Sequence, residues 1–391
     1  MNCVRALAVA ACFLGVAISA HSEEQAAPIE LKLSSPLDYQ VFQRKTEVIG
    51  VVHVAGILPY GSEAVEARLT GHSIGGDLPG QWQSLRPDVE GEGFGGDVRT
   101  QPGGWYRLEV RTTQAGKVTA TASIDHVGVG EVFVGAGQSN STNYGAEKQK
   151  PASGLVSSFS GKSWQLAEDP QLGAQDNSKG GSFWPSFGDA LVEKYHVPVG
   201  VVVTGCGSTS VREWLPKGMR MQQQPTTGRH VTSVGPGEWE STGQLFDALT
   251  NRIAQLGPHG FRAILWHQGE SDAGQARDGF PADRQITGDQ YRAFMEQLIR
   301  AVRAKAGWDM PWLVAQATYH SEKAPSDEEF RAAQKALWES GLALPGPDTD
   351  ALRAEYRAGV HFNAAGQRAH GKAWADKVEA YLDLFFTEGE E

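Results

Sequence analysis

The sequence predicts an α/β protein with a parallel sheet, preceded by a small all-β domain. Residues 28–128 contain short β-branched strands separated by Gly and Pro, with no segment of helical period among them. From residue 129 to 386, apolar strands alternate with amphipathic helices, which is typical of a parallel sheet covered on both faces. A chain of 391 residues is also long enough for two domains.

Residues 1–22 are predicted to form a secretory signal peptide. Arg5 supplies an early positive charge, an apolar run follows, and small residues precede the first acidic pair. The apolar run is too short for a membrane-spanning helix. We therefore expect a secreted or periplasmic protein. Cys3 and Cys12 would leave with the signal, so the mature chain would keep Cys206 alone and form no intramolecular disulfide.

Composition and charge exclude several classes of partner. The formal net charge is −11, and charged residues make up 21% of the chain. Nucleic acids and anionic membrane surfaces both attract clustered Lys and Arg, so neither is expected as a partner. Nothing after residue 22 is apolar enough to cross a membrane. The His, Asp and Glu residues show no spacing typical of a catalytic zinc site, and we expect neither metal nor cofactor.

The small domain, residues 28–128, is expected to be a β-sandwich. Five strands alternate or are rich in β-branched residues: 29–33, 47–54, 64–69, 105–111 and 118–124. Several strands at this spacing, with turn residues between them, are typical of a sandwich of about 100 residues. No cluster of acid, base and nucleophile stands out there. We expect an accessory domain that is structural or orients the substrate.

The larger domain, residues 129–386, is expected to alternate strands and helices. Strands are predicted at 131–134, 198–204, 263–267 and 312–316, and helices at 186–195, 244–256, 289–305, 330–339 and 366–386. Residues 216–243, rich in Gly, Pro, Gln and Thr, are expected to be a long irregular excursion. Loops of that length are usually functional or disordered.

The first candidate for chemistry is Ser139. A short strand, 131–134, runs directly into Gly-Ala-Gly-Gln-Ser-Asn, where small residues allow a sharp turn at its carboxyl end. In an open α/β sheet, ligands and reacting groups collect at that edge. A serine there can present its hydroxyl to solvent while its own N–H points into the same hollow. Alternatively, Ser139 and Asn140 cap the next segment.

Two further stretches follow the next two strands. Gly205-x-Gly207 can expose the backbone N–H that an oxyanion hole needs. As a phosphate-binding turn it would lack the remaining glycines and the lysine. Residues 266–274 contain Gly269-Glu-Ser-Asp-Ala273, one residue short of a Gly-x-Ser-x-Gly nucleophile elbow. On that alternative interpretation Ser271 attacks, with Asp350 as acid and His361 as base.

His361 lies just before the last helix, in Gly359-Val-His-Phe-Asn-Ala-Ala-Gly. A histidine near a helix N-terminus experiences the positive end of the dipole, which favours the neutral imidazole. A general base requires that form. The alternative is a partly buried loop histidine with a backbone partner.

These stretches together resemble the SGNH-hydrolase superfamily, in its sialate O-acetylesterase-like branch of carbohydrate acetylesterases. The matching pieces are Gly137-Gln-Ser-Asn140, Gly207-Ser-Thr-Ser-Val-Arg-Glu-Trp214, Trp266-His-Gln-Gly-Glu-Ser-Asp272 and Val360-His-Phe362. The resemblance covers roughly residues 129–386 and implies a three-layer α/β/α fold with a parallel sheet. A β-domain placed ahead of it also suits that branch.

The resemblance implies a role for each matching residue. Ser139 would be the nucleophile and His361 its general base. The oxyanion donors would be the N–H groups of Ser139 and Gly207 and the side-chain amide of Gln268. Two positions depart from the family pattern. The usual Asp three residues before the histidine is Ala358 here, and the usual Gly-Gly-Thr is Gly207-Ser-Thr.

With Ala358 at the usual acid position, three arrangements around His361 remain open. A backbone carbonyl could accept the Nδ1 proton and leave a working Ser-His dyad. A carboxylate from elsewhere could orient the ring, and Glu270, Asp348 and Asp350 are the candidates. In the third arrangement the ring has no support and the enzyme is inactive.

The function expected from these residues is removal of O-acetyl groups from a carbohydrate by an exported serine esterase. The reaction would proceed through an acetyl-enzyme on Ser139. One alternative is an O-acetyltransferase that uses the same Ser-His machinery. The other is a catalytically inactive carbohydrate-binding protein, which the absence of an acid at Ala358 allows.

Overall fold

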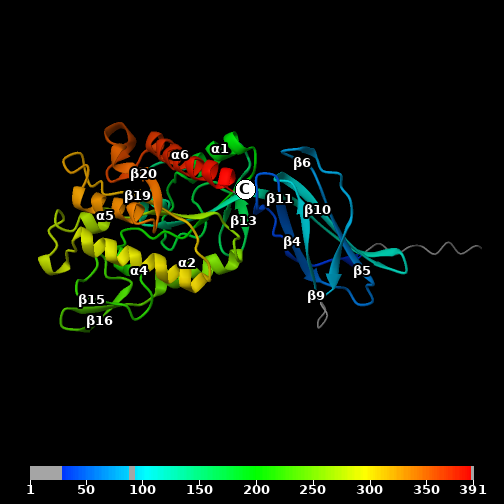
Figure 1. Cartoon of the computed structure of the whole chain (residues 1–391), viewed down its shortest axis with the longest axis horizontal. Helices are drawn as coiled ribbons and strands as arrows, with labels where there is room; N and C mark the ends of the chain where they lie inside the picture. Colours follow the sequence, from blue (N-terminus) through cyan, green and yellow to red (C-terminus); the bar gives the residue numbers. More distant parts are fainter. Residues whose placement is uncertain (1–28, 88–92, 389–391) are drawn as a thin grey trace, which may run out of the picture.

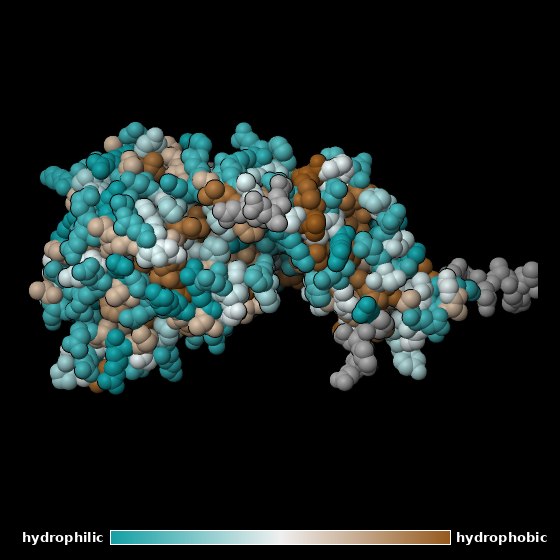
Figure 2. All heavy atoms as spheres, viewed as in Figure 1, coloured by the Kyte–Doolittle hydropathy of each residue, from teal (hydrophilic) through white to brown (hydrophobic). Residues whose placement is uncertain are grey.

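The computed structural model describes residues 29–87 and 93–388 (Figure 1). The N-terminal strands lie at one end of an elongated molecule, and the helices gather at the other. The predicted signal peptide, residues 1–22, lies outside the described residues. Hydrophilic side chains cover most of the visible face of the helical part (Figure 2). None of the helices among the described residues is long and apolar enough to cross a membrane.

The N-terminal part, up to residue 128, contains strands and no helix among its described residues. Its strands are β1 (Ile29–Glu30), β2 (Leu33–Ser35), β3 (Gln40–Gln43), β4 (Gly50–Ile57), β5 (Ala64–Thr70), β6 (His72–Ser73), β7 (Gly76–Asp77), β8 (Gln83–Pro87), β9 (Gly93–Thr100), β10 (Gly103–Gln114) and the first half of β11 (Lys117–Gly137). Alternate side chains point inward, as in Val52 and Val54 on β4 or Leu108 and Val110 on β10. They form an apolar core separate from that of the helical part.

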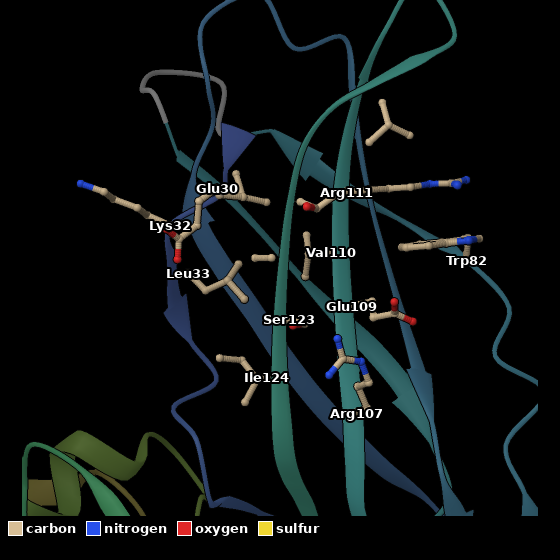
Figure 3. Close-up of a pocket in the computed structure, with 14 residues that line it drawn as sticks. Glu30, Lys32, Leu33, Trp82, Arg107, Glu109, Val110, Arg111, Ser123 and Ile124 are labelled. Atoms are coloured by element: carbon tan, nitrogen blue, oxygen red, sulfur yellow. The ribbon is translucent and has the colours of Figure 1, made fainter. Parts of the chain in front are cut away.

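The outward-facing side chains of β10 form a charged ladder around Trp82 (Figure 3). Arg68 on β5 bonds Glu109 at 2.8 Å, and both Arg68 and Arg111 lie over the Trp82 ring, 4.6 and 4.0 Å from its centroid. The hollow beside them has a volume of about 850 Å³. These charges make one face of β10 polar, while its other face packs into the apolar core.

Strand β11 passes from one sheet into the other. Its first half pairs antiparallel with β10, ending at Gly103 opposite Val129. From Glu131 onward it pairs parallel with β14 (Val199–Val203), and from Phe133 with β18 (Ala263–His267). The domain boundary predicted between residues 128 and 129 therefore falls inside a continuous strand.

The second sheet has β11 at its centre. Its order is β13-β12-β14-β11-β18-β19-β20, adding β12 (Val156–Phe159), β13 (Trp164–Leu166), β19 (Trp312–Gln316) and β20 (Leu344–Asp348). All neighbours are parallel except β12 and β13. Runs such as Val199–Val203 are buried along their whole length, because helices cover both faces.

The helices form two layers (Figure 1). Phe133 and Leu265 pack with α1 (Trp184–Tyr195) and α6 (Ala364–Glu388), while Val134 packs on the opposite face. That face is covered by α2 (Gln244–Leu256), α4 (Gly288–Ala306) and α5 (Glu328–Glu339). Neighbouring residues of one strand thus enter different cores. The predicted α/β architecture with a parallel sheet is confirmed.

Local sequence explains where several helices begin and end. Thr287 and Gln290 form a capping box at the start of α4, and Gly307 ends it with a left-handed φ of 78°. Asp327 accepts from the first N–H groups of α5. The prediction that 216–243 is irregular throughout was wrong. The segment folds into a small antiparallel sheet of β15 (Arg220–Met221), β16 (Val231–Gly235) and β17 (Glu238–Ser241), because Gly237 permits the tight turn between the last two.

A buried ion cluster joins the two parts of the chain. Glu131, fully buried on β11, accepts from Arg44 at 2.8 Å and from Arg262 at 2.8 and 3.0 Å. Gln43 donates to the same carboxylate at 2.9 Å. Burial alone would raise the pKa of Glu131, but the two guanidinium groups hold that pKa below its usual value.

Candidate active site

Ser139 lies at the first position of η1 (Ser139–Ser141), immediately after β11 ends. Gly137 turns the chain there with φ 127°, and a Cβ on it would lie 2.0 Å from the carbonyl oxygen of His267. Only glycine fits both conditions. The Gln138 N–H then donates to that same carbonyl at 2.9 Å. Ser139 is 5% exposed, and its N–H lies at a helix start, where N–H groups have no partner within the helix.

The ends of three parallel strands bring the first three predicted stretches together. The Cys206 N–H donates to the carbonyl of Gly137 at 2.9 Å, so Gly207 follows directly beside the turn that carries Ser139. On the other side, Gly137 pairs with His267, the residue before Gln268. Carboxyl ends of adjacent parallel strands meet at one edge, where α/β proteins bind their ligands.

The fourth stretch is tied to the nucleophile loop on both sides of His361. The side-chain amide of Asn140 donates to the carbonyl of Val360 at 3.3 Å. The Ala146 N–H donates to the carbonyl of Phe362 at 2.9 Å. The short strand β22 (His361–Phe362) thereby packs against η1. Within the described ranges, no hydrogen bond joins the Ser139 hydroxyl to the His361 ring.

The His361 ring is held by stacking. It lies against Tyr144 with ring centroids 5.0 Å apart and planes inclined by 29°. Burial lowers the pKa of His361; the charge of Glu270 acts to raise that pKa, and the charge of Arg357 acts to lower it further. A lowered pKa keeps the imidazole neutral near neutral pH, as a general base requires.

Two of the three candidate acids are committed elsewhere. Asp348 forms a two-pronged pair with Arg331 at 2.8 and 2.9 Å. Asp350, buried, accepts from Arg331 at 3.1 Å and from the N–H groups of Thr318 and Tyr319 at 2.7 Å each. Both carboxylates brace the segment after β20, and neither has a hydrogen bond to His361 in the described part of the chain.

Glu270 is the candidate acid whose charge acts on His361. Its Oε1 accepts from the Asn140 amide and faces His267 Nε2, each at 2.9 Å. Its Oε2 is buried and has no hydrogen-bond partner within residues 29–87 and 93–388. Burial would raise the pKa of Glu270, but His267 and Asn140 hold that pKa below its usual value, so the carboxylate is ionised.

A chain of aromatic nitrogens continues inward from Glu270. The Trp374 indole, which can only donate, gives its proton to His370 Nε2 at 3.0 Å. His267 Nδ1 lies 3.1 Å from the same Nε2, and His267 Nε2 lies 2.9 Å from Glu270 Oε1. Burial lowers the pKa of His370 well below its usual value, which keeps that ring neutral and able to accept from the indole. Glu270 and the two histidine rings therefore form a buried row of polar contacts beneath the site.

The Gly207 N–H, implied as an oxyanion donor, already has an acceptor. Asp176 Oδ2 lies 2.5 Å from this nitrogen. A carboxylate oxygen there occupies the position at which the N–H would meet the oxygen of a tetrahedral intermediate. Asp176 comes from a loop without periodic pattern, and the sequence offered no signal for it.

Gln268 is fully buried, and its amide hydrogens face inward. Its Nε2 donates to Asp272 at 2.7 Å and to the carbonyl of Thr209 at 3.1 Å, while its Oε1 is buried without a partner in the described structure. Asp272 also accepts from Ser210 and from the N–H of Val211. Gln268 is thus part of the framework that joins two strand ends. Its role as an oxyanion donor stays a prediction.

The alternative nucleophile Ser271 lies in the single turn α3 (Glu270–Ala273). Its N–H donates to the side chain of Gln138 at 3.0 Å. Asp350, the acid of that arrangement, is bound to Arg331 instead. In the described part of the chain, no group of three or more His, Cys, Asp or Glu side chains could hold a metal ion.

The larger part of the chain matches a known protein family. A family model described as "Carbohydrate esterase, sialic acid-specific acetylesterase" matches residues 129–380. The chain belongs to this family. It is a carboxylic ester hydrolase, and its family deacetylates carbohydrates. A comparison with curated proteins found no match.

Three solved structures are similar to this acetylesterase to different degrees. A carbohydrate acetylesterase from Xanthomonas citri is 18% identical, with a TM-score of 0.52 over 89% of this chain and 73% of that one. A protein from Arabidopsis thaliana is 18% identical, with a TM-score of 0.45 over 65% of this chain and 98% of that one. An acetyl xylan esterase variant from Geobacillus stearothermophilus is 15% identical, with a TM-score of 0.39 over 65% and 94%. The first of these supports the fold.

Proposed function

We propose that this family member is an exported serine esterase that removes O-acetyl groups from a carbohydrate through an acetyl-enzyme on Ser139. The observation that carries the proposal is the tether of Asn140 to Val360, because it links the residue after Ser139 to the residue before His361. The proposed nucleophile and base therefore belong to neighbouring loops at the carboxyl edge of the sheet.

In the proposed reaction, His361 acts in its neutral form. It takes the proton of the Ser139 hydroxyl as the oxygen attacks the acetyl carbonyl. The Ser139 N–H and the Gly207 N–H then stabilise the oxyanion, once the Asp176 carboxylate has withdrawn from Gly207. The imidazolium returns the proton to the departing sugar oxygen, and a water activated by His361 releases acetate.

Glu270 is proposed as the acid that replaces the carboxylate missing at Ala358. Its charge favours the protonated ring of His361, which forms during each step. Ala358 itself pairs with His361 across the β21 (Arg357–Ala358) and β22 hairpin, so it is close in the backbone but carries no acid. Glu270 acts here by charge, since no hydrogen bond to the ring is present among the described residues.

The substrate, the export of the protein and the role of its N-terminal strands are also proposed. The substrate is an acetylated carbohydrate, as in sialate O-acetylesterase-like enzymes. The predicted signal peptide supports export, and the N-terminal strands, with a core of their own, would form the accessory β-sandwich. Neither nucleic acid nor membrane is proposed as a partner, given the net charge of −11.

The test compares Ser139→Ala with Ser271→Ala in the purified mature chain. Acetate release from acetylated glycans should vanish in the first variant and persist in the second. Mass spectrometry of a quenched reaction should find an acetyl group on the peptide that contains Ser139. Retained turnover in Ser139→Ala, or an adduct on Ser271, would reject the proposal. Addition of an unacetylated glycan distinguishes transfer from hydrolysis, because a transferase would acetylate it.

A further inference from the structure

Tyr144 touches two parts of the site at once. Its ring stacks on His361, as described above. At its other end, a Cβ built on Gly207 would lie 2.5 Å from the Tyr144 hydroxyl oxygen and 2.7 Å from Cε2 and Cζ. The ring therefore spans the space between the base and the backbone of the oxyanion donor. Neither the motif match nor the proposed mechanism assigns it a role.

The backbone around Tyr144 is fixed. Gly145 and Gly181 exchange two hydrogen bonds of 2.8 Å, and a Cβ on Gly145 would lie 2.5 Å from Gln367. The next residue, Ala146, is bound to Phe362, beside His361. The ring is thus anchored immediately on its C-terminal side, while Ser139 lies five residues before it in a buried turn.

The Tyr144 hydroxyl is a neutral donor. Burial raises its pKa, and the charge of Asp176 raises it further, while Arg229 acts in the opposite direction. The hydroxyl therefore keeps its proton at the pH values at which His361 works. Within the described residues it has no hydrogen-bond partner and is not fully buried.

We propose that Tyr144 determines acyl specificity in this reaction: its ring positions His361 and forms the wall of the acyl pocket beside Gly207, so that an acetyl group fits and longer acyl chains do not. Ser139 and Gly207 are both almost fully buried, and the Tyr144 ring is the side chain that packs directly against Gly207. This inference rests on the proposed function, because it assumes that the acyl group is attached to Ser139.

The experiment measures kcat/KM for p-nitrophenyl acetate, propionate and butyrate in three variants. Tyr144→Leu removes the aromatic wall, so the ratio of acetate to propionate activity should fall about 10-fold, the scale of one methylene in an apolar pocket. Tyr144→Phe keeps the wall and should keep the ratio. Tyr144→Trp enlarges the wall and should raise the ratio. The Trp variant decides the matter where Tyr144→Leu does not fold.

A second measurement reports the positioning of His361. The charged groups that act on this ring are Glu270 and Arg357, and both are unchanged in these variants. In Tyr144→Leu the stacked ring is lost and water reaches His361, so the pKa of His361 should rise. The fall of kcat/KM at low pH, called the acid limb, should then move up toward about pH 6.5. Tyr144→Phe should leave the limb in place. A purely structural role would change the melting temperature without moving either the limb or the acyl ratio.

The matched control is Tyr39→Leu. Tyr39 also stacks on a histidine, His126, with centroids 4.0 Å apart, but among the N-terminal strands. Its substitution should leave acyl ratio and pH profile unchanged. Unchanged ratios in both Tyr144→Leu and Tyr144→Trp, with turnover retained, would overturn the inference. Failure of the proposed function would appear separately, as full activity in Ser139→Ala.

Discussion

The side-chain amide of Asn140 donates to Oε1 of Glu270 at 2.9 Å, although the two residues are 130 positions apart. The same nitrogen donates to the carbonyl of Val360. One amide group thus connects the nucleophile loop, the strand end that carries the candidate acid, and the loop of His361.

Glu270→Gln should lower kcat by between about 10² and 10⁴, because the imidazolium of His361 loses its stabilising charge. Steady-state kinetics on an acetylated substrate would measure this loss. Asp348→Asn is the control, since its partner is Arg331 and its effect should fall on thermal stability. A normal kcat in Glu270→Gln would mean that Ser139 and His361 work as a dyad.

The fall of kcat/KM at low pH, called the acid limb, should have its midpoint below the usual pKa of histidine. His361 must be neutral to accept a proton, so kcat/KM falls as the pH drops through its pKa, which burial places below about 6.5. Arg357→Leu removes a positive charge that opposes protonation, and the limb should move to higher pH. Arg353→Leu serves as the comparison, because Arg353 is not among the charges that act on His361. A limb that moves downward in Arg357→Leu would contradict this assignment.

Asp176→Ala should raise kcat/KM about 10-fold, because its carboxylate competes with the oxyanion for the Gly207 N–H. The matched control is Asp189→Ala, which also removes a carboxylate bound to backbone N–H groups, those of Ala152 and Ser153, away from the site. Kinetics for both variants should be compared with their melting temperatures. A fall in kcat/KM at unchanged stability would show that Asp176 assists the reaction.

Glu131→Gln should destabilise the fold by about 3–5 kcal/mol, because two buried guanidinium groups lose their counter-ion. Glu109→Gln, which removes a partly exposed pair with Arg68, should cost about 0–1 kcal/mol. Urea unfolding measures both changes in free energy.

The pH dependence of this stability has a definite sign. The pKa of Glu131 is lower in the folded state than in the unfolded chain. Its contribution is therefore complete above the unfolded pKa of about 4.3 and disappears as the pH falls through the folded pKa. Unfolding curves of the wild type and of Glu131→Gln should therefore approach each other as the pH falls from about 4.3 and meet below the folded pKa. Curves that stay parallel there would show that other groups set the acid limit.

The sequence predicted the edge at which the site assembles, because parallel strands place their carboxyl ends together. Ser139, Gly207 and Gln268 each follow such an end, and the structure places all three there. The direction in which each of these side chains points could not be predicted from the sequence. The amide of Gln268 faces inward because Asp272, four residues on, returns to it around one helical turn. No linear pattern shows which way a side chain points.

Contacts between segments that are distant in the sequence could not be predicted either. Asp176 lies 31 residues before Gly207, in a loop of irregular composition, and Tyr144 gave no motif. Asp348 and Asp350 were plausible acids by sequence distance from His361, yet Arg331 on α5 holds both. Only the packing of α5 beside β20 reveals that partner.

Because β11 is one uninterrupted strand, the register of the N-terminal sheet also fixes where the nucleophile turn begins. A one-residue slip of β11 would exchange the faces of every following side chain and send Phe133 into the opposite layer. The pairing with β10 has irregularities between Gly103 and Tyr106, between Tyr106 and Leu108 and between Thr112 and Thr113, and an inserted residue can be accommodated at such places. After Glu131, the pairing of β11 with β14 and with β18 is regular and contains no such irregularity. We therefore expect insertions and deletions to be tolerated in β11 before Glu131, where it pairs with β10. After Glu131 they should disrupt the pairing with β14 and β18.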